Sequence, residues 1–122
     1  MTTTSGSIAR LASAPEGSGE LDDLIWRAQR TPRAALFVQD RLPYTTSISA
    51  ALVSIPEGCY PTMLTWNSMG GDTGYCAMVI RGPFRKGGWH SDVVGKAKTP
   101  ALAICVAMMK ARGALQALRP AA

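Results

Sequence analysis

The sequence predicts an α+β fold in which helices pack on a small antiparallel sheet of about three strands, in the order α-α-β-β-β-α. Two changes of period predict it. Apolar residues recur with a helical period before residue 57, alternate between residues 60 and 94, and return to a helical pattern after Pro100. Because the second alternating stretch is apolar on both faces, we expect an α-β-α sandwich in which helices, or a partner, cover the sheet.

The length of 122 residues suits one domain, and 47% hydrophobic residues suit a globular protein. Eleven of the first 20 residues are Ser, Thr, Gly or Pro, a composition that buries too little apolar surface to offset its ordering entropy. We therefore predict a disordered N-terminal tail over residues 1–20, a single domain over 21–119 and a short C-terminal tail over 120–122.

Two helices are predicted before the sheet. The first begins at Leu21, where apolar residues follow helical spacing and two acidic residues lie in the first turn. The second lies within residues 44–56, where Thr45 or Thr46 can cap and the apolar positions are Ile48, Ala51, Leu52 and Ile55. Between them, residues 31–39 are predicted as helix or coil, because Thr31-Pro32 is typical of a helix start while residues 36–38 also suit a strand.

Three strands are predicted over residues 60–66, 74–81 and 89–94, since apolar and polar residues alternate there and glycine-rich turns separate them. The turn NSMGGDT predicts a hairpin with a long tip. Its Gly70–Gly74 segment could also be taken for a phosphate-binding loop, but it lacks the lysine and the following helix of one.

The last element is a helix that begins after Thr99 as cap and Pro100 as first residue, and that reaches Leu118. It is apolar nearly all round, which predicts either the centre of the core or a contact with another chain. Its longest apolar run has nine residues, so no membrane span is expected.

The charge is unevenly distributed, and it points to an acidic partner. The net charge is +5, and all the positive excess lies after residue 57, where eight basic residues accompany only Asp72 and Asp92. Between residues 81 and 98, cations alternate with aromatic rings that can stack on bases or fill a pocket. The predicted binding residues are Arg81, Phe84, Arg85, Lys86, Trp89, His90, Lys96 and Lys98. The alternative is a solvated loop whose Trp89 packs into the core.

No catalytic or metal-binding motif accompanies these residues, so we predict no enzyme activity, no cofactor and no metal. His90 is the only histidine, and a lone histidine without a placed nucleophile or carboxylate is usually structural. The chain has three cysteines, an odd number, and they are widely spaced: Cys59, Cys76 and Cys105. They predict reduced thiols and a cytoplasmic location.

Two segments carry a family resemblance. The residues YTTSISAALVSIPEG (44–58) and KTPALAICVAMMKARGAL (98–115), with a three-strand region between them, resemble the phage ABA-sandwich domain family of small phage and prophage proteins. The resemblance spans roughly residues 20–118. It implies a layered α/β architecture and a phage-associated origin in the host cytosol, and it implies no activity.

Three functions remain open on the sequence. The first is a non-enzymatic phage accessory protein that binds and inhibits a host protein or protein–nucleic acid complex, such as a CRISPR-type or other defence complex. The second is direct nucleic-acid binding through residues 81–98; the order of one helix, three strands and a helix preceded by Lys96 and Lys98 is shared with double-stranded-RNA-binding domains. The third is an assembly protein that dimerises through the C-terminal helix.

Overall fold

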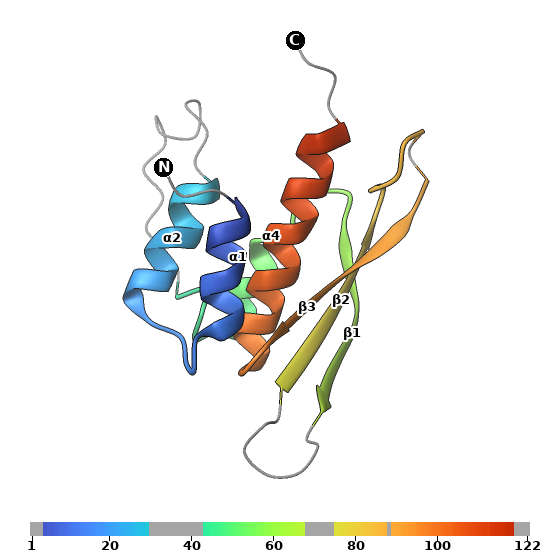
Figure 1. Cartoon of the computed structure of the whole chain (residues 1–122). Helices are drawn as coiled ribbons and strands as arrows, with labels where there is room; N and C mark the ends of the chain where they lie inside the picture. Colours follow the sequence, from blue (N-terminus) through green and yellow to red (C-terminus); the bar gives the residue numbers. More distant parts are fainter. Residues whose placement is uncertain (1–3, 30–42, 68–74, 88, 119–122) are drawn as a thin grey trace.

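The computed structural model describes residues 4–29, 43–67, 75–87 and 89–118, and it confirms the α+β prediction. The elements are α1 (Thr4–Ser13), α2 (Gly19–Gln29), α3 (Ile48–Val53), β1 (Tyr60–Asn67), β2 (Tyr75–Gly82), β3 (Ser91–Ala97) and α4 (Pro100–Leu118). The strands form one antiparallel sheet in the order β1-β2-β3. Figure 1 shows the described helices on one side of this sheet.

Helix α1 is the main departure from the predicted order, which becomes α-α-α-β-β-β-α. Leu11 and Ser7 are buried, and α1 packs beside α4. Residues 4–13 therefore do not form the disordered tail that their composition predicts. The reason is tertiary, because a helix of weak intrinsic propensity is stabilised when its apolar face is buried against another element. The predicted C-terminal tail lies outside the described residues.

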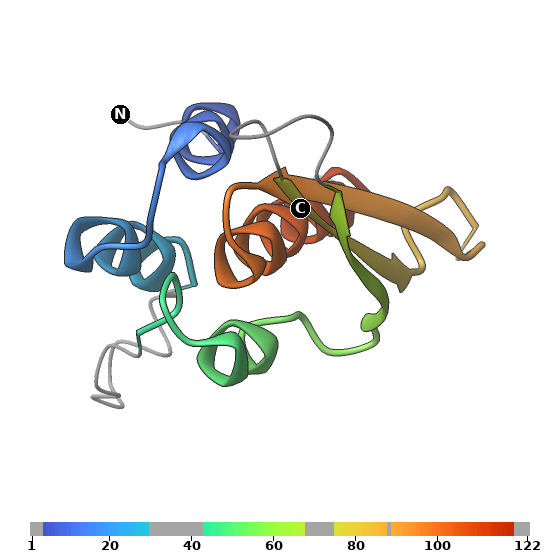
Figure 2. The ribbon, with the colours of Figure 1, turned by 90° about the horizontal axis from the view of Figure 1, so that it is seen from below.

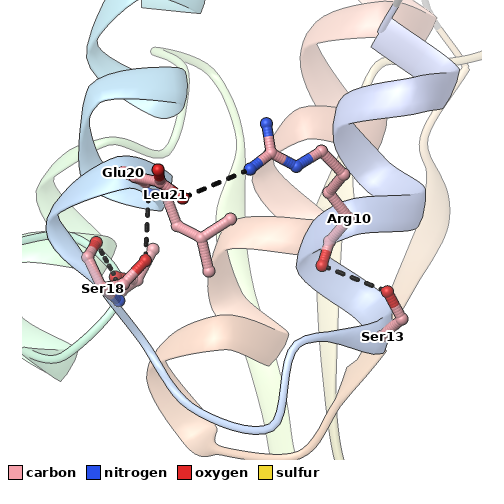
Figure 3. A network of polar contacts seen from close by, with 6 residues as sticks. Arg10, Ser13, Ser18, Glu20 and Leu21 are labelled. Carbon is pink, nitrogen blue, oxygen red and sulfur yellow. Dashed lines mark hydrogen bonds and ion pairs between the residues drawn. The ribbon is translucent and has the colours of Figure 1, made fainter.

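Helix α2 begins after Ser18, whose hydroxyl accepts a hydrogen bond from the N–H of Leu21 at 3.2 Å. Figure 3 shows this cap and the exposed ion pair that joins α1 to α2, with Arg10 Nη2 3.8 Å from Glu20 Oε2. Such an exposed pair contributes little stability. The burial of Ile25 and Leu21 in the core is what holds α2 in place.

A buried hydrogen-bond network fixes the chain where it enters α3. Asp22 Oδ1 accepts from the N–H of Thr45 at 2.8 Å and from its hydroxyl at 2.6 Å. The same hydroxyl accepts from the N–H of Ser18 at 3.0 Å. Thr45 is therefore a tertiary anchor, and the predicted capping role belongs to Ser47, whose hydroxyl accepts from the N–H of Ala50 at 3.2 Å. The helix or coil predicted over residues 31–39 lies outside the described residues.

The sheet confirms the three predicted strands with small shifts of their ends. In the antiparallel pair β1–β2, the register runs from Tyr60 opposite Arg81 to Asn67 opposite Tyr75, with a bulge between Pro61 and Met63. In the pair β2–β3, it runs from Cys76 opposite Ala97 to Gly82 opposite Ser91. The tip of the first hairpin, including the segment Gly70–Gly74, lies outside the described residues.

Helix α4 is the centre of the core. It lies across β2 and β3, and Figure 2 shows α1 and α3 on opposite sides of it. Ten of its residues are buried, from Ala101 to Met109 and at Ala111. By length and composition alone it could cross a membrane, but its apolar faces are occupied by the sheet and by the other helices.

The close approach of α4 to the sheet depends on small residues. A Cβ at Gly95 of β3 would lie 2.5 Å from the carbonyl oxygen of Ala103 and closer still to the backbone nitrogen of Ala107. Glycine at position 95 and alanines at positions 103 and 107 therefore let the backbone of the helix rest on the strand. Ala103 and Ala107 thus lie on the face of α4 that packs on the sheet.

Candidate binding surface

The eight predicted binding residues divide into separate groups in the structure. Five lie in the turn between β2 and β3, which we call the hairpin tip: Phe84, Arg85, Lys86, Trp89 and His90. Arg81 lies on β2, Lys96 near the far end of β3 and Lys98 just beyond it. A strand of seven residues is about 20 Å long, so one small ligand cannot contact both the hairpin tip and Lys98.

Backbone hydrogen bonds shape the hairpin tip. The N–H of Phe84 donates to the carbonyl of Gly82 at 2.8 Å, and the N–H of Arg85 donates to the carbonyl of Trp89 at 3.2 Å. Gly87 has a φ of 87°, which favours glycine. These two hydrogen bonds and Gly87 therefore shape the described part of the turn.

The two aromatic rings of the hairpin tip have different environments. Phe84 is half-buried and packs on the core, close to Gly82 and Cys59. A Cβ at Gly82 would lie 2.6 Å from the Phe84 ring, so the glycine makes room for it. Trp89 is 73% exposed, with Arg85, Lys86 and His90 also exposed. Core packing of Trp89, the alternative that the sequence leaves open, is therefore wrong.

The cations on the sheet are already engaged within the fold. Arg81 Nε lies 3.0 Å from Asp92 Oδ1 across the strand pair, and this hydrogen bond with the charge of Asp92 raises the pKa of Arg81. Lys96 Nζ lies 5.4 Å from the centre of the Tyr75 ring. Lys98 is exposed next to the start of α4. Arg85 and Lys86 are thus the predicted cations that accompany an exposed aromatic ring.

The titratable side chains do not gather into a site. Cys76 and Cys105 are buried and Cys59 is half-buried, and burial raises the pKa of each thiol. His90 is exposed at the hairpin tip. Within the described ranges, no three His, Cys, Asp or Glu side chains come close enough to hold a metal ion.

An exposed apolar region on α3 and β1 was not predicted. Of the apolar positions that the period predicts for this helix, Ala51 is buried and Ile55 is half-buried against the core, while Ile48 is 44% and Leu52 38% exposed. Ala50 is buried beside Ala51, and Val53 is 73% exposed. On β1, three large side chains are also exposed: Tyr60, Met63 and Leu64. A signal for this region exists in the sequence, since Glu57 is the only charged residue between positions 44 and 67.

Three comparisons with known proteins were made for this chain. No protein-family model, curated protein or solved structure matches it. The resemblance to the phage ABA-sandwich domain family therefore stays a prediction that depends on residues 44–58 and 98–115. Support for a function comes from the fold and from the exposed residues of the hairpin tip.

Proposed function

We propose that the protein acts by binding, as a phage or prophage accessory protein whose hairpin tip docks on an acidic surface of a host protein complex. The observation that carries the proposal is Trp89, which is 73% exposed on a turn shaped by its own hydrogen bonds. An exposed indole loses little conformational entropy when it is buried in an interface, and tryptophan is a frequent hot-spot residue.

The charge of the hairpin tip indicates the chemistry of the partner. Arg85 and Lys86 are exposed next to Trp89, and the segment 82–90 contains no acidic residue. Cations at the rim of an interface guide association with an acidic surface, while the buried ring supplies affinity. The segment 82–90 contains no carboxylate, thiol or hydroxyl to accompany His90, so binding accounts for the tip better than proton transfer does. A host defence complex of CRISPR or other type, located in the cytoplasm, is the partner that the family resemblance favours.

Direct nucleic-acid binding is the second candidate, because the same cations and ring suit phosphates and an unstacked base. The two candidates differ in salt dependence. For duplex DNA, each phosphate that the protein contacts adds about −0.9 to the slope of the logarithm of affinity against the logarithm of salt concentration.

Dimerisation through α4 is the third candidate. It has less support, because the buried residues of α4, from Ala101 to Met109 and at Ala111, are covered within the chain.

A capture experiment from host lysate separates these candidates. We would capture partners of the tagged full chain with and without nuclease, and identify them by mass spectrometry. The key variants are Trp89→Ser and the pair Arg85→Ala with Lys86→Ala. The matched control is Lys96→Ala with Lys98→Ala, which removes the same charge from the other end of β3.

The outcomes are distinct. A protein that survives nuclease, and that is lost with the tip variants and retained with the control, supports the proposal. Recovery of nucleic acid alone supports the second candidate. If the Lys96 and Lys98 control loses as much partner as the Arg85 and Lys86 pair, the hairpin tip is not the docking site.

A further inference from the structure

The two faces of the sheet are covered differently. Burial alternates along β2, where Cys76, Met78 and Ile80 are buried on the face that α4 covers. The residues between them point to the opposite face, over which Figure 1 shows no described helix. We call this second face, made of the alternate residues of β2 from Tyr75 to Arg81 and their neighbours on β1 and β3, the open face.

The strand register places a tyrosine next to a cation at each end of the open face. At the end near the hairpin tip, Tyr60 of β1 lies directly opposite Arg81 of β2, and Tyr60 is 48% exposed. At the other end, Tyr75 begins β2 and Lys96 Nζ of β3 lies 5.4 Å from the centre of its ring. Because Tyr75 and Arg81 lie near the two ends of one strand, the two pairs are about 20 Å apart.

The surface between the two pairs is apolar. Met63, Val79 and Val94 form one row across the three strands, and Met63 is 56% and Val94 37% exposed. Ala77, in the next position along β2, is half-buried. The open face therefore has an apolar centre between two rings, with a cation beside each ring.

The charge of the molecule attracts an anion to the sheet rather than to the outer helices. Residues 4–29 contain α1 and α2, on the helical side in Figure 1, and carry four acidic side chains against Arg10 and Arg27. After residue 57, where the chain forms the sheet and α4, eight basic residues accompany two acidic ones. The field of such a distribution guides a negatively charged ligand to the basic part.

We propose that the open face binds single-stranded nucleic acid, with bases stacked on Tyr60 and Tyr75 and phosphates held by Arg81 and Lys96. A nucleotide supplies both a flat base for a ring and a phosphate for the cation beside it. An acidic peptide would pair with the cations but would leave the rings without a planar partner, and a duplex keeps the faces of its bases stacked inside. This surface differs from the hairpin tip, and the inference does not depend on a protein partner there.

The two cations keep donors beyond their contacts within the fold. A guanidinium has five N–H donors, and the bond from Arg81 Nε to Asp92 uses one, while the Arg81 side chain is 49% exposed. Lys96 is exposed, and its contact with the ring of Tyr75 is weaker than the stacking of a base, so Lys96 can turn to a phosphate. Asp92 repels phosphates at this face, so its charge limits the affinity.

The test is binding of the full chain to fluorescently labelled oligonucleotides of about 12 nucleotides, measured by anisotropy. The probes are oligo(dT), oligo(U) and a DNA duplex of the same length, and the first two show whether DNA or RNA is preferred. We expect the preferred single strand to bind at least about fivefold more tightly than the duplex, because only the single strand offers bases for stacking. Each phosphate contacted should contribute about −0.7 to the salt slope.

Arg81→Gln has a matched control in Arg10→Gln. Both arginines form an ion pair with a carboxylate, and their side chains are 49% and 54% exposed. Arg81→Gln should weaken binding and reduce the magnitude of the salt slope by about 0.7, whereas Arg10→Gln should leave both unchanged. Tyr60→Leu should weaken binding at least about fivefold through lost stacking. Asp92→Asn should strengthen binding, an effect that a damaged fold would not produce.

Photocrosslinking of the unmodified chain to oligo(dT) that contains 4-thiothymidine locates the ligand without any variant. We expect crosslinked peptides from β1 and β2. Crosslinks confined to the hairpin tip overturn the proposal, as does equal weakening by Arg81→Gln and Arg10→Gln. Absence of binding at about 100 µM protein and low salt overturns it as well. Failure of the lysate capture to recover a protein would contradict docking by the hairpin tip and would leave these results unchanged.

Discussion

Helices α4 and α3 are both rich in alanine and aliphatic residues, yet the fold treats them in opposite ways. Ten of the 19 residues of α4 are buried, whereas α3 buries two alanines and exposes Ile48, Leu52 and Val53. The difference lies in their neighbours, because the sheet, α1 and α3 surround α4 while α3 packs mainly on α4 within the described fold. Burial therefore follows the number of covered sides, and an apolar helix with one covered side keeps part of its apolar surface exposed.

The largest expected effect comes from truncation in α4. Ile104 is fully buried, so Ile104→Ala removes methylene groups from the core and leaves a cavity. We expect a loss of about 4 kcal/mol in the free energy of unfolding. Urea unfolding followed by circular dichroism measures it. A loss below about 1 kcal/mol would mean that α4 is not the centre of the core.

The next effect concerns the anchor that holds the entry to α3. Asp22→Ala leaves the N–H of Thr45 without its buried acceptor, while the Thr45 hydroxyl loses Asp22 and keeps the carbonyl of Ser18, at 3.1 Å, as an acceptor. We expect a loss of about 2 kcal/mol, with a smaller loss for Asp22→Asn, which keeps a side-chain oxygen. Hydrogen exchange should show faster opening of α3 than of the middle of α4. Equal acceleration of both helices would show that they unfold as one unit.

The thiol of α4 predicts a smaller, pH-dependent effect. Burial, together with the charge of Asp22, raises the pKa of Cys105 from 9.0 to about 12. Between these values the folded chain keeps a proton that the unfolded chain releases, so stability is present below about pH 9 and falls as the pH rises through it. The slope is at most about 1.4 kcal/mol per pH unit for one thiol.

The variant Cys105→Ala tests this slope. Its free energy of unfolding should fall less steeply than that of the original chain between about pH 8 and pH 10. Because Cys59 and Cys76 remain in both proteins, the difference between the two slopes belongs to Cys105. Identical slopes would mean that the Cys105 thiol titrates normally in the folded protein.

The smallest effect is expected in α3. Leu52 is 38% exposed, so Leu52→Ser should change the free energy of unfolding of the monomer by less than about 1 kcal/mol. The measurement belongs at low protein concentration, where self-association does not contribute. A loss comparable with that of Ile104→Ala would place Leu52 in the core and remove the contrast between the two helices.

Local signals explain which parts of the fold could be predicted. Thr99 caps α4 by accepting from the N–H of Leu102 at 3.2 Å, and Pro100 begins it, as the sequence indicates. Helix α1 escaped prediction because its stability depends on the burial of Leu11 against a helix nearly a hundred residues away in the sequence. The exposed face of α3 was not predicted for a similar reason. Periodicity identifies a helix, but it does not show how many sides of the helix other elements cover.

The residue types of the predicted binding segment can be read from the sequence, but their arrangement in space cannot. Residues 81–98 contain the cations and rings that the sequence selects, but a strand separates Trp89 from Lys98. The cross-strand pairing of Arg81 with Asp92 depends on the register of β2 and β3, which the composition of the segment does not contain. Strand pairing thus decides which members of a basic segment remain available for a partner.

The contact between α1 and α4 has a consequence for the order of folding. These helices are the first and last elements of the fold, and Figure 1 shows them side by side. Closing this contact brings together segments separated by roughly 90 residues, and such long loops slow the folding of a chain. During synthesis, Leu11 and the apolar face of the sheet stay uncovered until residues 100–118 have left the ribosome. The core therefore forms late in synthesis, after the described segments before α4 have been made.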